Sequence, residues 1–514
     1  MRNYKHLCKV HQKTHFFCNF APAKRQMALN NNNNIPAGRG SKFLKDIGVY
    51  AIGNIGSKII TFMMVPLYTY FVHDTSDFGY YDVCLTVCFL LLPFVTLQLR
   101  DGAFRFLLDC DDETRRKSIV TFVSRAMLST LSVAVLATIV LVFTTDIGYL
   151  GYVLGLLVAL SLQEVYSQVF RGLGNNRAFV MVGILSAIGI GLLSVLFVAG
   201  LGWGIKGVFA ANIIARVVAL IVVEMRVHLI FRNTRWSIPT RDVGREILRY
   251  TLPLLPGSLC WWITGSSEPL FIKHFIGLDV NGVYAVAIRF TGIISTLAII
   301  FYQAWQETAI LQYNSPDRNS FFSRMFNGYI FLLSAILVGY VFMLKINYGW
   351  LVAEEYSESL YYIYPLGVSA VIFAIAAFFD MGYQCAKDTK RTLPAIVLAA
   401  VVNVVLNLSL IRLLGVYGVI ISQLITYIVL VIYRWHDMKR YFVLKISPRV
   451  LVPIAVILFS ALPFYSSLYI NNGPGVWFDI AYMVVAIALI FWACGKDARD
   501  MFLSKFTKTA GSTK

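Results

Sequence analysis

The lysines and arginines of this chain are sorted into alternate loops between long apolar segments. When these segments are counted as fourteen membrane helices, 37 of the 45 basic residues fall in the loops and tails of one side and four on the other. The remaining four lie inside the helices. The positive-inside rule places the basic side, and with it both termini, in the cytoplasm. The pattern predicts an all-α polytopic membrane protein with about 14 transmembrane helices.

The apolar segments have the length that a membrane span requires. A helix that crosses the hydrocarbon core needs about 20 mostly apolar residues. The chain supplies many such runs, with 58% hydrophobic residues and a mean hydropathy of +0.68. We predict spans at residues 48–72, 80–99, 118–143, 147–170, 178–199, 207–225, 250–272, 283–305, 325–344, 360–379, 393–411, 416–433, 450–469 and 477–494.

Three short patterns recur about 200 residues apart, which indicates that a six-helix unit is duplicated. Gly79-Tyr80-Tyr81 matches Gly282-Val283-Tyr284, and Gln168 with Arg171 matches Gln384 with Lys387. The stretch from Gly204 to Val208 matches the stretch from Gly415 to Val419. The alternative explanation is that glycine and aromatic residues simply favour helix ends. Because six is even, the duplication predicts two six-helix lobes related by a pseudo-two-fold axis along the membrane normal, plus two appended helices.

The predicted domain organisation follows from these repeats and from the charged segments. From the N-terminus it comprises a disordered basic cytoplasmic tail (1–45), a first lobe (46–232), a basic cytoplasmic linker (233–249), a second lobe (250–434), two appended helices (435–495) and a cytoplasmic tail (496–514). Cys8, His11, His15 and Cys18 have a spacing that could hold zinc, but nothing around them predicts a folded module, and we predict no metal site.

Several functions are disfavoured by the composition. The net charge of +18 is spread over short loops beside membrane helices, where it sets orientation and attracts anionic lipids, so we expect no nucleic-acid partner. The eight cysteines are scattered and predict no disulfide framework. No phosphate-binding loop of the G-x-x-x-x-G-K-[ST] type is present, so we expect no ATP hydrolysis.

Four basic residues lie inside the predicted spans and are the candidate binding residues. Lys58 and Arg216 lie near mid-depth, whereas Arg125 and Arg289 lie about two turns inside a helix end. A charge near the bilayer centre is costly and is kept mainly where it faces protein or a watery cavity. Arg and Lys in such a cavity favour an anionic cargo, and Arg can bind phosphate oxygens with two parallel hydrogen bonds. The alternatives are that Arg125 and Arg289 extend to the membrane surfaces and that Lys58 and Arg216 pair with buried acids.

Three acidic residues are candidates for coupling transport to an ion gradient. Glu164, Glu268 and Asp380 lie in or at the ends of predicted spans, where a carboxylate can bind Na⁺ or H⁺. Each is equally explained as an interfacial or structural charge. No cofactor other than this coupling ion is expected. Asn403 and Asn407 form one polar stripe, for which hydrogen bonding between helices is the favoured role.

Pro253 and Pro256 interrupt the start of the seventh predicted span. A break of this kind survives in lipid only where neighbouring groups or water satisfy the freed carbonyls. We predict a hinge for alternating access at these residues, although proline is also common at helix beginnings.

Several stretches resemble the polysaccharide-transporter branch, the Wzx-type flippases, of the multidrug/oligosaccharidyl-lipid/polysaccharide exporter superfamily. They are Tyr250 to Trp262, Phe271 to Leu278, Gly282 to Ala287, Gly56-Ser57-Lys58, Phe78 to Tyr81, Gln303 to Gln306 and Asn403 to Leu408. The resemblance covers roughly Leu44 to Arg449. Where relatives commonly carry an acid followed by Arg, this chain has Glu268-Pro269.

The resemblance implies two six-helix lobes around a central cavity and a function as a transporter rather than an enzyme. Its cargo would be undecaprenyl-pyrophosphate-linked oligosaccharide, moved across the bacterial inner membrane for surface polysaccharide synthesis, with membrane lipids and polysaccharide assembly proteins as partners. The alternatives are a cation-coupled drug or metabolite antiporter of the same fold, for which mid-membrane acids would be expected, and an O-antigen polymerase or ligase. Such an enzyme would need extracytoplasmic Arg or His residues, which these short loops scarcely provide.

Overall fold

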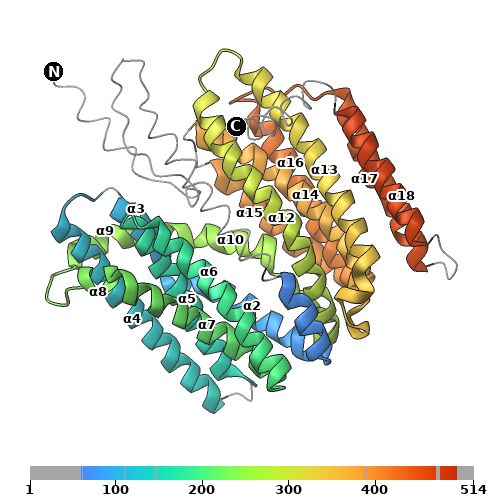
Figure 1. Ribbon diagram of the computed structural model, residues 1–514. Helices are drawn as coiled ribbons and strands as arrows, with labels where there is room; N and C mark the ends of the chain where they lie inside the picture. Colours follow the sequence, from blue (N-terminus) through green and yellow to red (C-terminus); the bar gives the residue numbers. More distant parts are fainter. Residues whose placement is uncertain are drawn as a thin grey trace, which may run out of the picture. The chain divides into compact units, whose positions relative to one another are not determined.

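The computed structural model describes residues 60, 62–108, 110–144, 148–386, 388, 391–469 and 475–494. In these ranges the chain forms helices joined by short turns, and no strand is found. The chain divides into two compact units, drawn in Figure 1. The first comprises Met1–Lys273 with Gly277–Gly282, and the second comprises His274–Ile276 with Val283–Lys514.

The first unit contains the helices up to α11. They are α2 (Thr75–Thr96), α3 (Leu99–Leu108), α4 (Glu113–Thr144), α5 (Leu150–Gly172), α6 (Asn176–Ser194) with the π-helical turn η2 (Val195–Gly200), α7 (Gly204–Val227), α8 (Leu229–Asn233), α9 (Arg241–Thr251), the 3₁₀ turn η3 (Leu252–Leu254), α10 (Leu255–Ser266) and most of α11 (Glu268–Phe275).

The second unit contains most of α12 and everything that follows. Its elements are α12 (Leu278–Gln312), α13 (Arg318–Leu351), η4 (Glu354–Tyr356), α14 (Ser359–Cys385), α15 (Thr392–Leu414), α16 (Val416–Met438), η6 (Pro448–Val450), α17 (Leu451–Tyr469) and α18 (Val476–Ala493).

Twelve helices in the described ranges are long and apolar enough to cross a membrane. The chain is therefore a multi-pass membrane protein, but the predicted number of fourteen spans is not reached in these ranges. Most of the first predicted span lies outside the described residues, and its described part is the short apolar helix Phe62–Phe71.

The seventh predicted span, residues 250–272, is interrupted near Pro253 and Pro256 as predicted, and it also has a second break that was not predicted. The chain there passes from α9 through the 3₁₀ turn η3 into α10, and a second break at Ser267 separates α10 from α11. Pro253, Pro256 and Pro269 explain the breaks, because a proline has no amide hydrogen for the hydrogen bond that would continue an α-helix. Whether the first break acts as a hinge stays a prediction.

The internal repeat is visible in the helix packing of the two units. In the first unit α7 packs along α6 and against α5, and in the second unit α16 packs in the same way along α15 and against α14. The equivalent glycines Gly204 and Gly415 both begin their helices with positive φ, at +53° and +58°. Three residues later, Gly207 and Gly418 lie against the backbone of the preceding helical segment. Glycine is thus required at these sites by conformation and by close approach, not only by a helix-end preference.

The repeated glycines Gly79 and Gly282 lie against each other in the structure. These two glycines lie where α2 crosses the first turns of α12, within the first unit. A Cβ atom added to Gly79 would lie 2.8 Å from the Gly282 nitrogen, and one added to Gly282 would lie 3.1 Å from the Gly79 nitrogen. The Asn281 amide, fully buried, donates to the Gly79 carbonyl oxygen at 2.9 Å. The two backbones therefore touch at a point that no larger residue can occupy.

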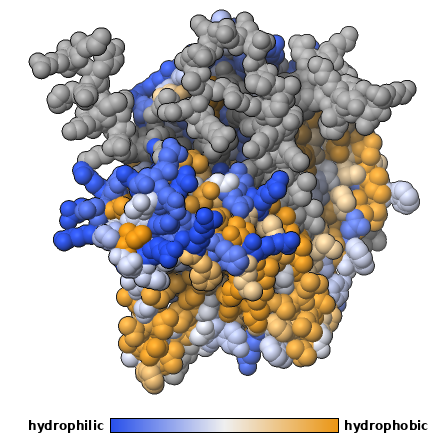
Figure 2. All heavy atoms as spheres, turned by 60° about the vertical axis from the view of Figure 1, so that its left-hand side comes forward, coloured by the Kyte–Doolittle hydropathy of each residue, from blue (hydrophilic) through white to orange (hydrophobic). Residues whose placement is uncertain are grey.

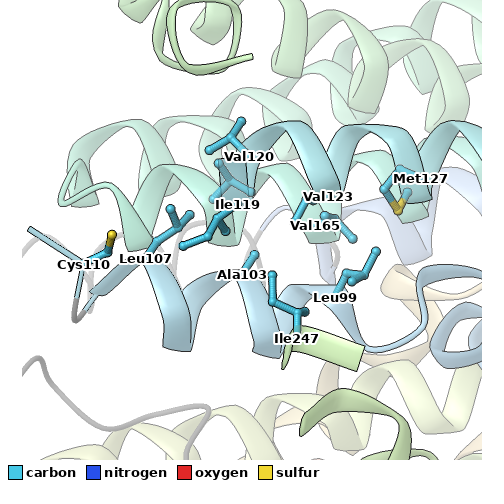
Figure 3. Close-up of a cluster of buried hydrophobic side chains, with 11 residues drawn as sticks. Leu99, Ala103, Leu107, Cys110, Ile119, Val120, Val123, Met127, Val165 and Ile247 are labelled. Carbon is cyan, nitrogen blue, oxygen red and sulfur yellow. The ribbon is translucent and has the colours of Figure 1, made fainter. Parts of the chain in front are cut away.

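The core of the first unit brings α3, α4, α5 and α9 together. Figure 3 shows side chains from these four helices converging, among them Leu99, Val123, Val165 and Ile247. Ile247 is buried although α9 carries many charges, because α9 is amphipathic and turns one narrow face inward. The charged linker helix is thereby fixed to the transmembrane helices.

The outer surface of α4 is apolar and has little protein against it. Its most hydrophobic stretch has a mean hydropathy of 2.4, yet only 6% of that stretch is buried inside the protein. Figure 2 shows, on the side where α4, α8 and α9 lie, hydrophilic residues gathered above a mostly hydrophobic surface. Exposed apolar area of this extent indicates contact with lipid.

Candidate functional site

A cluster of polar side chains lies in the first unit where α5, α6 and α7 pack together. Arg216 lies about midway along α7, and its Nη1 donates a hydrogen bond to Oε1 of Gln163 on α5 at 2.7 Å. Nε2 of Gln163 donates in turn to Oγ of Ser186 on α6 at 3.0 Å. Three helices thus hold one guanidinium group in place inside a membrane span.

The direct partner of Arg216 is a neutral amide. Among the described residues, no carboxylate lies within 4.0 Å of its guanidinium nitrogens, and its buried Nε has no hydrogen-bond partner. Among these residues Arg216 therefore does not pair with a buried acid, which was the alternative explanation. A guanidinium that keeps its charge and an unused N–H donor has the chemistry of an anion-binding group.

A charged pair lies beside this cluster. Nη1 of Arg100 on α3 donates to Oε2 of Glu164 on α5 at 2.8 Å, and Nε of Arg100 lies 3.4 Å from Oδ1 of Asp101. The Arg100 and Glu164 side chains are 34% and 37% exposed. Arg100 was assigned to a loop by hydropathy, but after Leu97 and Gln98, which have positive φ, the chain continues helically as α3. No pattern in the chain indicates that Arg100 pairs with Glu164.

Arg125 on α4 binds the linker that precedes α9. Its Nη1 donates to Oγ1 of Thr240 at 3.1 Å, its Nη2 donates to the carbonyl oxygen of Trp236, and its guanidinium lies 6.0 Å from the centre of the Trp236 ring. These contacts give Arg125 a role in positioning the linker. A role in binding cargo stays a prediction.

Neither of the other two basic candidates belongs to the described residues of the first unit. Arg289 lies on α12 in the second unit, with a partly exposed side chain. Lys58 lies outside the described residues.

Asp380, a predicted coupling residue, is part of a buried network in the second unit. Its Oδ1 lies 3.3 Å from Nη2 of Arg434 on α16, and its Oδ2 accepts from Nε2 of Gln384 at 3.0 Å. Arg434, whose side chain is only 1% exposed, also donates to the Ala376 carbonyl oxygen at 2.8 Å. Gln306 at the end of α12 donates to Oε1 of Gln384 at 2.6 Å. The network ties α12, α14 and α16 together.

Glu164 and Asp380 occupy equivalent positions in the two halves. The offset of 216 residues that relates Gln168 to Gln384 also relates Glu164 to Asp380. Each acid pairs with an arginine, Arg100 and Arg434 respectively, although the two arginines come from non-equivalent helices. The shared offset can be read from the sequence, but the equivalence of the two acids becomes clear only from the two ion pairs in the structure.

The remaining polar candidates are placed as follows. Glu268 is buried in the first turn of α11. Asn403 and Asn407 are fully buried on α15, and Nδ2 of Asn407 donates to Oδ1 of Asn403 at 2.9 Å, so they bond along one helix.

A second buried ion pair was missed because Lys345 was assigned to a loop. Lys345 lies inside α13, and its Nζ is 2.9 Å from Oδ1 of Asp479 in the first turn of α18. Both side chains are 6% exposed. Nζ also donates to the Pro463 carbonyl oxygen on α17 at 3.2 Å, and it lies 5.2 Å from the Phe464 ring centre. One lysine therefore holds both appended helices against α13.

Comparison with known proteins gives one family match. The family model described as "Polysaccharide biosynthesis protein" matches residues 43–306. No curated protein matches the chain by sequence.

Solved structures share the fold at low sequence identity. The lipid II flippase MurJ in an inward closed conformation has a TM-score of 0.63 at 13% identity, over 89% of this chain and 100% of that one. An inward-facing multidrug resistance MATE family transporter of the MOP superfamily has a TM-score of 0.61 at 14% identity, over 76% and 95% of the two chains. At these identities the matches establish a common fold.

Proposed function

Because the chain belongs to the polysaccharide biosynthesis protein family, as the resemblance of its motifs predicted, we propose that it is a flippase for lipid-linked oligosaccharide. The cargo would be an undecaprenyl-pyrophosphate-linked repeat unit, moved from the cytoplasmic to the outer leaflet of the bacterial inner membrane. Both termini would lie in the cytoplasm. The protein would act by rocking of its two halves, with Pro253 and Pro256 as a bending point, and would carry out no covalent chemistry.

The observation that carries this proposal is the environment of Arg216. Its guanidinium is fixed by Gln163, keeps an unused donor and has no carboxylate partner among the described residues. A pyrophosphate is a dense anion whose oxygens accept the parallel hydrogen bonds that arginine donates. Lys58, Arg125 and Arg289 would complete an electrostatic path for the headgroup, while the prenyl chain stays in lipid.

The same environment favours an anionic cargo over the cationic drug of an antiporter. An organic cation would be repelled by Arg216 and would need an acid that is free to receive it. Glu164 and Asp380 are each engaged by an arginine, which also repels a coupling Na⁺ or H⁺. Glu268, in the first turn of α11, is kept together with these two acids as a candidate coupling residue. Polysaccharide assembly proteins would be partners in the cell.

Replacement of Arg216 by glutamine is expected to reduce flipping of a fluorescent lipid-linked oligosaccharide in proteoliposomes by about tenfold or more. A hydrogen bond to a charged group contributes about 1.5–3 kcal/mol, and 1.4 kcal/mol corresponds to a factor of ten. Arg216→Lys should retain part of the rate, because it keeps the charge but loses the two-pronged geometry. The double variant Lys58→Gln/Arg216→Gln should abolish surface polysaccharide in cells while the protein remains in the membrane.

Arg412 supplies the matched control. It is an exposed arginine near the end of α15, and Arg412→Gln should flip at the rate of the unaltered protein. An unchanged rate in the folded Arg216→Gln variant would contradict the proposed role of Arg216. A protein that flips no lipid-linked sugar would refute the function itself.

A further inference from the structure

An open pocket lies at one end of the first unit, where the beginnings of α2, α5 and α7 meet. Its volume is about 520 Å³, within the range of small-molecule sites. It is lined by aromatic residues, a carboxylate and an amine, namely Tyr149, Tyr152, Trp203, Asp77 and Lys206. Lys206 is one of the four basic residues that the sequence places on the side opposite the cytoplasm.

Trp203 is held in place with part of its surface free. Gly202 and Gly204 flank it with φ of +64° and +53°, and its amide nitrogen donates to the Phe197 carbonyl oxygen at 2.9 Å. The Phe197 ring stacks on the indole at a centroid distance of 5.0 Å and an interplanar angle of 11°. Trp203 is nevertheless 50% exposed. The π-helical turn η2 ends at Gly200, shortly before Trp203, and such turns are frequent at functional sites.

Tyr149, which also lines the pocket, is packed among other aromatic rings. Tyr149 has φ of +58°, a conformation that costs a bulky residue energy and persists only where its surroundings enforce it. Its ring packs against Tyr152, Phe209 and Tyr80, with centroid distances of 6.2, 6.4 and 5.7 Å. A strained aromatic residue beside an open pocket is the pattern expected of a binding site.

The chemistry of the lining selects the class of ligand. Aromatic rings offer flat apolar faces, Asp77 accepts hydrogen bonds and Lys206 donates them. A phosphate would be repelled by Asp77, whereas a neutral sugar ring has an apolar face for the indole and hydroxyl groups for both charged side chains. Lys206 precedes Arg216 by ten residues, a rise of about 15 Å along α7, which an oligosaccharide of a few sugars spans.

We propose that this pocket binds a sugar residue of the transported oligosaccharide, with Trp203 as the stacking platform and Asp77 and Lys206 as hydrogen-bonding partners. The assignment rests on the proposed function, since it takes its ligand from the same cargo whose pyrophosphate Arg216 would bind. The sugar would then be bound near the beginning of α7 and the pyrophosphate near its middle.

The test is equilibrium binding to full-length protein in lipid nanodiscs with two probes, inorganic pyrophosphate and the host's repeat-unit oligosaccharide freed from its lipid by mild acid. Trp203→Ala should weaken oligosaccharide binding at least tenfold and leave pyrophosphate binding unchanged. Arg216→Gln should weaken pyrophosphate binding at least tenfold and leave oligosaccharide binding unchanged. Trp203→Phe should retain part of the affinity for the oligosaccharide, and Asp77→Asn should reduce that affinity several-fold. These two variants still test the proposal if Trp203→Ala does not fold.

Trp477 is the matched control, since it is an 83% exposed tryptophan at the beginning of α18 on the same predicted side of the membrane. Trp477→Ala should bind the oligosaccharide normally, whereas a role of Trp203 only as a membrane-interface anchor would make the two variants alike. Unchanged oligosaccharide binding in Trp203→Ala or Asp77→Asn, or no binding to the unaltered protein, would overturn the sugar site. Loss of the Arg216 effect on pyrophosphate would instead count against the proposed function.

Discussion

Replacement of Asp479 by alanine is expected to destabilise the protein by about 3–5 kcal/mol, because it leaves the buried ammonium of Lys345 without its counter-charge. The two groups are 2.9 Å apart and are nearly inaccessible. The Pro463 carbonyl oxygen on α17 is the remaining hydrogen-bond acceptor that the lysine reaches at 3.2 Å, and it carries no formal charge. The measurement is the free energy of unfolding in detergent or bilayer, with release of α17 and α18 followed by proteolysis.

A double replacement separates the free-energy cost of an unpaired buried charge from the net contribution of the ion pair to stability. Lys345→Met/Asp479→Leu removes both charges and fills similar volume, so it should be much closer in stability to the unaltered protein than Asp479→Ala is. The exposed Val484 on the same helix gives a control, since Val484→Ala should have little effect. If the single and double variants were equally unstable, the pair would be acting through packing and not through its charges.

Replacement of Gly282 by alanine is expected to destabilise the protein by about 4 kcal/mol or more, a magnitude reserved for strongly disruptive changes. The added methyl group would lie 2.9 Å from the Thr75 carbonyl carbon and 3.1 Å from the Gly79 nitrogen, both backbone atoms that cannot rotate away. Gly79→Ala should have a similar effect, because its Cβ would approach the Gly282 nitrogen to 2.8 Å. Thermal unfolding of the purified variants measures both.

Gly292 lies on the same helix and provides the matched control. A Cβ atom there meets nothing within 4 Å, so Gly292→Ala should be neutral or more stable by up to about 1 kcal/mol, the difference in helix propensity. The double variant at Gly79 and Gly282 should lose less than the sum of the two single variants, because both break one contact. A Gly282→Ala protein as stable as Gly292→Ala would show that α2 and α12 do not touch there.

The charged residues show where sequence reasoning succeeded and where it stopped. Arg216 was identified correctly as a basic residue inside a span, because hydropathy locates the centre of a helix well. Arg434 and Lys345 were counted as loop residues, although both are buried in helices that continue beyond the apolar run. Hydropathy ends a helix where the apolar run ends, whereas the backbone continues beyond it when neighbouring helices satisfy the charges that follow.

The hydrogen-bond and ion-pair partners of the charged residues could not be predicted from the sequence either. Nothing in the sequence distinguishes Gln163, which holds Arg216, from other amides in the chain, and Arg100 and Glu164 are 64 residues apart. A pairing of that kind depends on which faces of two helices meet, and several rotations are compatible with apolar surfaces that lipid solvates as readily as protein does.

The sequence by itself determined the class of fold, the approximate position of most spans and the duplication of a helical unit. In lipid every backbone polar group must be satisfied within its own segment, so a long apolar run becomes a helix whatever its neighbours are. Only the tertiary structure decided which charges are paired, that the seventh span breaks a second time at Ser267, and why Gly79 and Gly282 must both be glycine. Those outcomes depend on contacts between distant segments, and such contacts leave no local pattern in the chain.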